Sequence, residues 1–162
     1  TIRVARQIRE ALSPGHYAMP ELERIHALLR EVGLRDVEHV ARRFPHELSG
    51  GQRQRIMIAM ALASEPLLLF ADEPTTALDA TVQLQVLETL HRLHLERRMA
   101  MVIITHDLGV VAALCDRVYV MRGGKVVESA NTIELFDAPR HPYSARLIEL
   151  TRRSRPATQG TP

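Results

Sequence analysis

The sequence contains no tryptophan and only one cysteine, Cys115, among its 162 residues. A single cysteine excludes a disulfide framework within the chain and is typical of a protein from a reducing cytosol. The apolar residues that precede Cys115 predict a helix face, so we expect the thiol to pack in the core. Aromatic residues make up 4% of the chain and the formal net charge is +2. This balance gives no reason to expect nucleic-acid binding.

The sequence also lacks an uninterrupted apolar run of about 18 residues, so it predicts no membrane-spanning helix. Residues 1–6 predict the entry into a helix and not a signal peptide. The length suits one domain with a sizeable core. Any connection to a membrane is therefore expected to come through a partner.

The segment around which the chain is organised is an apolar run over residues 67–71. It leads into two adjacent carboxylates, Asp72 and Glu73, and Pro74 then stops it. Such a run predicts a fully buried strand of a parallel sheet, and ligands bind at the carboxyl ends of parallel strands. An Asp at this position can hold Mg²⁺ beside phosphates, and a second acid can orient or deprotonate a water molecule. Alternatively, the acids only cap the next helix.

Hydrophobic periodicity predicts that the first third of the chain is helical. Residues 2–12, 20–32 and 36–43 carry helical stripes and no strand signals. The apolar face of the second stripe comprises Leu22, Ile25, Leu28, Leu29 and Val32. Residues 53–62 are apolar nearly all round, which predicts a buried helix.

The remainder alternates strands and helices. Asp79 is placed to cap a long helix, and Gly123-Gly124 predicts a two-residue hairpin turn. Further strands are predicted at residues 101–104 and 117–121, further helices through residues 110–114, 132–136 and 144–151, and a linker from residue 152 onward. The order strand, helix, strand, helix, strand predicts an α/β fold with parallel pairing.

A second candidate site is Leu48-Ser49-Gly50-Gly51-Gln52, which directly precedes the predicted buried helix. A serine and two glycines at a helix start let backbone N–H groups converge on an anion such as a phosphate. Alternatively, Ser49 only caps the helix and the glycines form a turn.

Four segments, taken together and in order, resemble motifs of the ATP-binding-cassette (ABC) ATPases. The first, Leu48 to Gln52, is similar to their signature motif, and Asp72-Glu73 is similar to the end of their Walker B strand. Thr76-Ala77-Leu78-Asp79 resembles the D-loop, and His106, after the second buried strand, resembles the switch histidine.

The resemblance implies a role for each position. Asp72 would act on Mg²⁺, Glu73 would be the general base that polarises the attacking water, and His106 would reach the γ-phosphate. For His106 the alternative role is a helix cap. The signature motif would bind ATP held by the opposite subunit, with Asp79 at the dimer seam. The nucleotide-binding residues would thus be Leu48, Ser49, Gly50, Gly51, Gln52 and Asp79.

A finer resemblance points to the di-/oligopeptide importer branch, and His141-Pro142-Tyr143 carries most of it. His141 is expected to fix the start of a C-terminal helix and not to bind a ligand. Members of that branch commonly have a cysteine cluster for an iron–sulfur centre after this helix. The sequence has no such cluster, and we predict no iron–sulfur centre in this chain.

The chain departs from the family in having no Gly-x-x-x-x-Gly-Lys-[Ser/Thr] loop. Its one Gly-Lys pair, Gly124-Lys125, lies in the predicted hairpin. Because that loop cradles the phosphates, we expect this chain alone to bind ATP poorly and to hydrolyse none. A half-built core with an open sheet edge also predicts self-association.

The expected fold is therefore α/β: the second half of a RecA-like P-loop NTPase core, with a mostly parallel sheet, plus the α-helical signature subdomain. The expected divisions are a helical subdomain (1–62), the ATPase core (63–130), a C-terminal helical extension (131–151) and a flexible tail (152–162).

The resemblance implies that the intact protein hydrolyses ATP, with Mg²⁺, to power an importer of di-/oligopeptides or similar small solutes. It implies a second ABC ATPase domain in a head-to-tail dimer, transmembrane permease subunits and, indirectly, a solute-binding protein, all served from the cytoplasmic face of the membrane. One alternative is a catalytically incompetent half-protein that completes or regulates a partner's ATPase site. Another is a soluble ABC protein of DNA repair or translation, which the His141-Pro142-Tyr143 segment disfavours.

Overall fold

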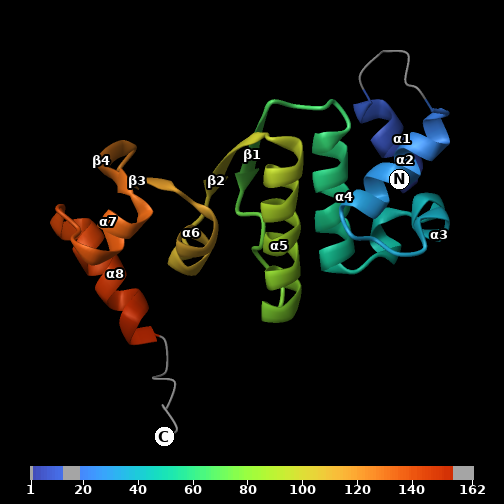
Figure 1. Cartoon of the computed structure of the whole chain (residues 1–162). Helices are drawn as coiled ribbons and strands as arrows, with labels where there is room; N and C mark the ends of the chain where they lie inside the picture. The colour runs from blue at the N-terminus through green and yellow to red at the C-terminus, as the bar shows by residue number, and fades with distance from the viewer. Residues whose placement is uncertain (1, 13–18, 155–162) are drawn as a thin grey trace, which may run out of the picture. The chain divides into compact units, whose positions relative to one another are not determined.

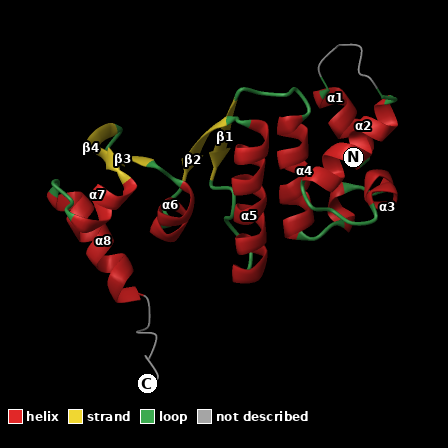
Figure 2. Cartoon of the chain, viewed as in Figure 1, coloured by secondary structure: helices red, strands yellow, loops and turns green. Residues whose placement is uncertain are grey.

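The computed structural model describes residues 2–12 and 19–154, which form a mixture of helices and strands (Figures 1 and 2). In chain order the elements are α1 (Val4–Ala11), α2 (Glu21–Glu31), α3 (Val37–Arg42), η1 (Pro45–Glu47), α4 (Gly50–Leu62), β1 (Leu68–Asp72), α5 (Ala80–Arg97), β2 (Ala100–Ile104), α6 (Leu108–Leu114), β3 (Arg117–Arg122), β4 (Lys125–Asn131), α7 (Thr132–Asp137) and α8 (Pro142–Ser154). Two compact units are present, Thr1–Ile104 and Thr105–Pro162. Within the described ranges, no helix combines the length and the apolarity needed to cross a bilayer.

Helix α4 lies at the centre of the first unit, with α1 and α2 packed on it and α5 beside it (Figure 1). Apolar side chains from these four helices are fully buried, among them Ile8, Ile25, Leu28, Leu62 and Leu90. Burying one such side chain contributes about 1.5–3 kcal/mol. This shared core confirms the helical stripes read from the sequence.

Two positions on these helices correct the predicted apolar faces. Leu22, in the first turn of α2, is 53% exposed, and Met57 of α4 is 55% exposed. Helix α4 is therefore buried on most sides but not all round. Both residues lie on faces that no described element covers.

Polar contacts fasten the helical part of the first unit to α5. Glu31, at the end of α2, accepts a hydrogen bond through Oε2 from Nη2 of Arg97 at 2.7 Å. Arg55 of α4 donates to the backbone carbonyl of Val32 at 2.6 Å and to the hydroxyl of Thr89 at 2.9 Å. Since Thr89 and Arg97 both belong to α5, these bonds hold α2 and α4 against it.

Strands β1 and β2 pair in parallel, with Leu68 opposite Ala100 and Asp72 opposite Ile104. Helix α5 is the crossover between them, which confirms the predicted strand–helix–strand unit. The prediction that both strands are fully buried is wrong. Leu69 is buried in the helical core, but Phe70, which points to the opposite face, is 65% exposed. The other exposed apolar residues of these strands are Leu68, Val102 and Ile104.

The second unit contains a β-hairpin. Strands β3 and β4 pair in antiparallel fashion, from Arg117 opposite Asn131 to Arg122 opposite Lys125. Gly123 and Gly124 form the turn at φ values of 57° and 74°, a left-handed backbone that glycine adopts readily. The predicted hairpin is thus confirmed. Among the described residues β3 pairs with β4 alone, so the expected parallel sheet is limited here to β1 and β2.

A small core joins the hairpin to the helices that follow it. Leu135 of α7 and Ile148 of α8 pack with Ala130 of β4. Cys115 is the C-cap of α6 and is half-buried, so it does not lie on a helix face as predicted. Burial raises the pKa of its thiol, and the charge of Asp116 raises it further.

Helix α8 continues beyond residue 151, where the tail was expected to begin. It runs to Ser154, and Arg152 donates a hydrogen bond to the backbone carbonyl of Phe136 at 2.8 Å. Arginines in the last turn are also favoured by the helix dipole. Residues 155–162 of the expected tail lie outside the described residues.

Glu128 of β4 is a buried carboxylate that holds the start of α8. Its Oε1 accepts from the N–H of Arg140 at 2.8 Å and its Oε2 from the N–H of His141 at 3.1 Å. The buried hydroxyl of Ser144 lies close by, short of full hydrogen-bond geometry. Burial raises the pKa of Glu128, but Ser144 and the two N–H donors outweigh burial, and the pKa lies below its usual value.

We expect Glu128→Gln to loosen α8, because the amide loses the charge and offers an N–H group to one of two N–H donors. The amides of residues 142–154 should exchange with solvent about tenfold faster at neutral pH, as expected when a charge-assisted bond is lost. Since the folded pKa is lowered, the charged carboxylate stabilises at neutral pH, and this stabilisation disappears as the pH falls through the folded pKa.

Hydrogen exchange of wild type, Glu128→Gln and the control Glu149→Gln checks this. Glu149 pairs with Arg153 on the exposed side of α8, so its variant should change exchange little. Equal protection of α8 in all three proteins at neutral pH would contradict the role of Glu128.

Candidate functional site

Ser49 and Gln52 form a reciprocal capping box at the start of α4. The Ser49 Oγ accepts from the N–H of Gln52 at 3.2 Å, and the Gln52 Oε1 accepts from the N–H of Ser49 at 3.0 Å. The preceding Leu48 is buried in the core of the unit and anchors the approach to the helix. The capping role of Ser49 is confirmed, and its phosphate-binding role stays a prediction.

Gly50 and Gly51 are the first two residues of α4, and neither has a positive φ. The alternative in which these glycines form a turn is therefore wrong, because helical backbone begins directly after Ser49. Gly51 is buried, and it faces the first turn of α5.

Asp72 and Glu73 lie at the carboxyl end of β1, as predicted. The Asp72 side chain is exposed, whereas Glu73 is half-buried. The N–H of Glu73 donates to the carbonyl of Ile104 at 2.8 Å, which extends the ladder between β1 and β2 by one bond. The strand end therefore fixes the backbone from which the Glu73 carboxylate projects.

The loop after β1 turns sharply and holds the Glu73 side chain. Glu73 and Ala77 have φ values of 47° and 63°, which are uncommon for residues other than glycine. The hydroxyl of Thr76 donates to Glu73 Oε2 at 2.8 Å. Pro74 and Thr75 are buried, so the loop is anchored at its middle.

Asp79 caps α5, as predicted. Its Oδ1 accepts from the N–H of Val82 at 2.9 Å. Because α4 and α5 lie side by side in the first unit (Figure 1), the residues similar to the signature motif and to the D-loop stand at the starts of adjacent helices.

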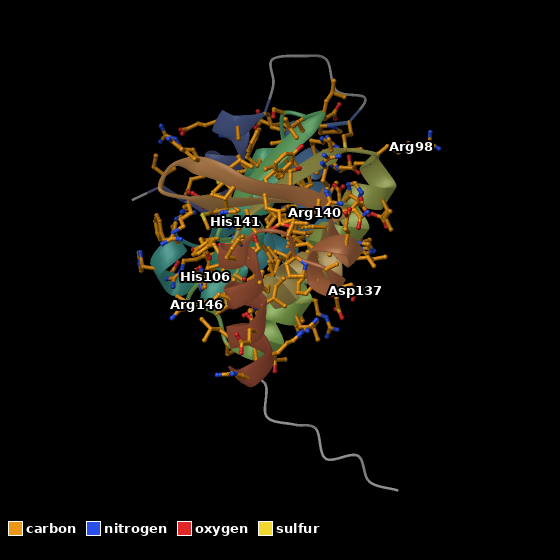
Figure 3. The ribbon with its side chains drawn as sticks, turned by 90° about the vertical axis from the view of Figure 1, so that its left-hand side faces the viewer. Arg98, His106, Asp137, Arg140, His141 and Arg146 are labelled. Carbon is orange, nitrogen blue, oxygen red and sulfur yellow. The ribbon has the colours of Figure 1, made fainter. Side chains whose placement is uncertain are left out.

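His106 is an exposed residue of the second unit, labelled in Figure 3. The alternative in which it caps a helix is wrong, because Asp107 is the N-cap of α6 and accepts from the N–H of Gly109 at 2.7 Å. Asp72 and Glu73 belong to the first unit, and a meeting of His106 with them stays a prediction.

His141 fixes the start of α8, which confirms the prediction. Its Nδ1 accepts from the N–H of Tyr143 at 3.1 Å, and its own N–H is held by Glu128 (Figure 3). Arg122 of β3 stacks over the Tyr143 ring, 4.8 Å from its centroid. The His-Pro-Tyr segment is thus built into the fold of the second unit.

The residue expected to act on Mg²⁺ is Asp72. In the part of the chain that the structure describes, no three His, Cys, Asp or Glu side chains gather into a metal cage. Mg²⁺ at phosphate sites needs no such cage, since one or two carboxylates, phosphates and waters hold it. A single exposed carboxylate at a strand end fits this requirement.

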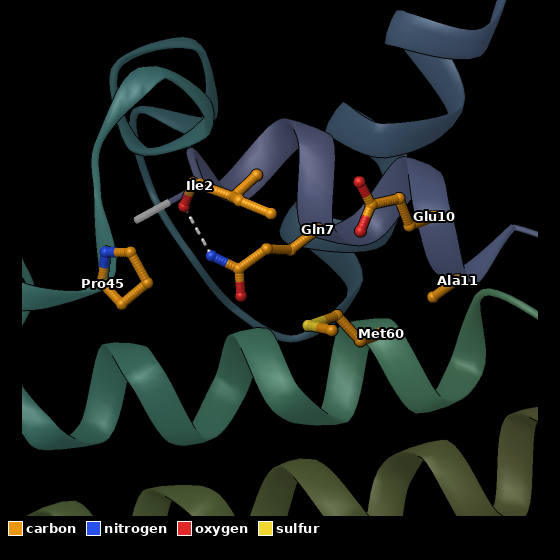
Figure 4. A pocket seen from close by; sticks show the side chains of 6 residues that line it. All are labelled: Ile2, Gln7, Glu10, Ala11, Pro45 and Met60. Atoms are coloured by element: carbon orange, nitrogen blue, oxygen red, sulfur yellow. Dashed lines mark hydrogen bonds between the residues drawn. The ribbon is translucent and has the colours of Figure 1, made fainter.

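A cavity of about 540 Å³ opens in the first unit among α1, η1 and α4 (Figure 4). Its lining residues are Ile2, Gln7, Glu10, Ala11, Pro45 and Met60. None of the predicted site residues lines it. Gln7 donates to the carbonyl of Ile2 at 2.7 Å across its rim, so one of its few polar groups is already engaged.

Sequence reasoning missed two residues that hold the candidate site. Thr76 binds the Glu73 carboxylate, and Val82 lies against Gly51. A hydroxyl three residues after a key acid is a local signal for the first. No local signal identifies the second, because Gly51 and Val82 come from different helices.

Comparison with protein families supports the resemblance. A model of the ABC transporter family matches residues 3–76. The chain is 45% identical over 161 residues to the oligopeptide transport ATP-binding protein OppD of Lactococcus lactis subsp. cremoris, covering 98% of this chain and 46% of that protein. It is also 45% identical over 147 residues to the glutathione import ATP-binding protein GsiA of Escherichia coli, covering 90% of this chain and 24% of that protein. The chain thus spans less than half the length of these relatives.

The fold has a counterpart among solved structures. A dimeric post-hydrolysis structure of the ATP-binding cassette MJ0796, bound to ADP and Pi, matches with a TM-score of 0.69 and 28% identity. The match covers 81% of this chain and 57% of that chain. The mixed α/β arrangement is therefore that of an ATP-binding cassette.

We expect Ser49→Ala to lower the free energy of unfolding by about 1 kcal/mol, because it removes a helix cap. Ser49→Thr keeps the hydroxyl and should change stability less. Thermal unfolding of both variants beside wild type measures the difference. An alanine variant as stable as the threonine variant would show that the capping box contributes nothing.

Proposed function

Because the chain belongs to the ABC transporter family of ATP-binding proteins, in the oligopeptide-import branch, we propose that it is part of a subunit that powers solute import by hydrolysing ATP. The observation that carries this proposal is the acid pair at the carboxyl end of β1, where the Thr76 hydroxyl holds Glu73. Di- or oligopeptides are the proposed cargo. The printed names of the relatives include oligopeptide and glutathione transport.

Each site residue has a proposed task in this reaction. Glu73 accepts a proton from the attacking water or orients it, and Asp72 holds Mg²⁺. A bound Mg²⁺ neutralises charge on the β- and γ-phosphates. His106 contacts the γ-phosphate. Residues 48–52 and Asp79 meet the nucleotide of a second ATPase domain, with the N–H groups at the start of α4 directed at phosphate.

The proposed partners are a second ABC ATPase domain, transmembrane permease subunits and, through them, a solute-binding protein. The subunit would work at the cytoplasmic face of the membrane. The dimeric form of the MJ0796 cassette supports the pairing of two such domains.

We further propose that these 162 residues are the helical subdomain and the second half of the ATPase core of a longer cassette. Two observations support this. The chain covers 46% of OppD, and the exposed face of β1 and β2 carries apolar residues such as Phe70 that a further layer would cover. A phosphate-cradling Gly-Lys-Ser/Thr loop would then lie elsewhere in the polypeptide.

The mass of the native polypeptide tests this division. We expect it to exceed the 18.3 kDa of the present sequence by at least about 80–100 residues, the size of a half-domain. The added sequence should contain the missing loop. A native mass of 18.3 kDa would instead favour a half-protein that completes or regulates a partner's ATPase site.

We expect Glu73→Gln in the native polypeptide to lower ATP turnover at least about 100-fold, because the amide cannot accept a proton. ATP binding should persist, since the side chain shape is kept. Steady-state phosphate release and equilibrium ATP binding measure the two effects separately.

Glu65→Gln is the matched control. Glu65 also has a positive φ of 52°, but its carboxylate pairs with Arg24, away from the end of β1. Its variant should keep wild-type turnover. If Glu73→Gln and Glu65→Gln turned over ATP equally fast, Glu73 would not be the general base.

A further inference from the structure

The starts of α4 and α5 approach so closely that one position tolerates no side chain. A Cβ atom on Gly51 would lie 2.4 Å from Cγ1 of Val82, far inside van der Waals contact. A Cβ atom on the neighbouring Gly50 would lie 3.3 Å from Cδ2 of Leu78, the flexible end of a side chain. Two adjacent glycines therefore differ sharply in the space around them.

Backbone conformation does not explain why Gly51 is a glycine. Both glycines are helical, and neither has a positive φ. Glycine inside a helix is less stable than alanine, so helix formation alone would favour alanine at both positions. What Gly51 provides is the room that Val82 occupies.

Val82 links the two candidate motifs by two different contacts. Its N–H donates to Asp79 Oδ1 at 2.9 Å, and its side chain lies against Gly51. Gly51 sits between Ser49 and Gln52, whose capping box closes the first turn of α4. An unbroken set of contacts thus runs from Asp79 through Val82 to Ser49.

We propose that Val82 is a positioning residue that locks the starts of α4 and α5 together, so that Ser49 and Asp79 move as one body. Further along the same pair of helices, Arg55 donates to Thr89 and reinforces the contact. Tightly packed interfaces of this kind shift as units and do not deform gradually.

The consequence for catalysis rests on the proposed function. If residues 48–52 and Asp79 both face a second ATPase domain, a fixed spacing makes them engage that domain together. A wedge between α4 and α5 would then misplace one motif relative to the other and slow turnover. Geometry errors of this size reduce rates strongly even when no reacting group is lost.

A double-mutant cycle in the native polypeptide tests the contact. The variants are Gly51→Ala, Val82→Ala and the two combined, with Gly50→Ala as the matched control. Each is measured by its thermal unfolding midpoint and by ATP turnover with its permease. Val82→Ala removes the methyl groups with which an alanine at position 51 would collide.

We expect Gly51→Ala to lower the unfolding midpoint by several degrees and turnover by about tenfold, both more than Gly50→Ala does. The combined variant should recover to within about threefold of the turnover of Val82→Ala alone, because the collision has gone.

Two results would overturn the proposal. If the combined variant regains stability but not turnover, Gly51 is required at the nucleotide and Val82 does not position it. If it regains neither, the contact is not what excludes alanine. Absence of ATP turnover in the wild-type complex would instead refute the proposed function, and the stability measurements would still decide whether Val82 excludes a side chain at Gly51.

Discussion

The packing of α4 against α5 places every other element of the first unit. Helices α1 and α2 bury apolar faces on α4, whereas β1 leads into α5 and β2 leaves it. Ser49 and Asp79 stand immediately before these two helices as their N-caps. The positions of two polar residues are therefore decided by hydrocarbon packing some distance away. Interiors packed at this density transmit such constraints because they compress little.

Much of the fold follows from signals that act within a few residues. The Gly123-Gly124 turn and the Asp79 cap each depend on neighbours two to four positions away, and both are found as predicted. Burial of the strands does not follow from local sequence. The apolar run at residues 67–71 predicts a strand covered on both faces, but Phe70 is exposed because the described residues supply a layer on only one face.

The candidate site was predictable in its motifs and not in its supports. Ser49, Asp72, Glu73 and Asp79 stand at the element ends that the sequence indicated. Glu128 had no assigned role, because an acid in a half-exposed strand looks like a solvated side chain. Its partners lie 12 and 13 residues further along the chain. A buried carboxylate becomes recognisable only once the backbone donors that surround it are known.

Backbone strain gives a separate route to Glu73. A left-handed conformation costs about 1–3 kcal/mol for a residue with a side chain, and glycine would remove that cost. The chain nevertheless keeps a glutamate there, with its N–H on the Ile104 carbonyl and its carboxylate on the Thr76 hydroxyl. Strain alone does not identify a reactive residue, since Glu65 has a similar φ and pairs with Arg24. Glu73 combines the strain with a second acid and a parallel strand end, where charged ligands bind.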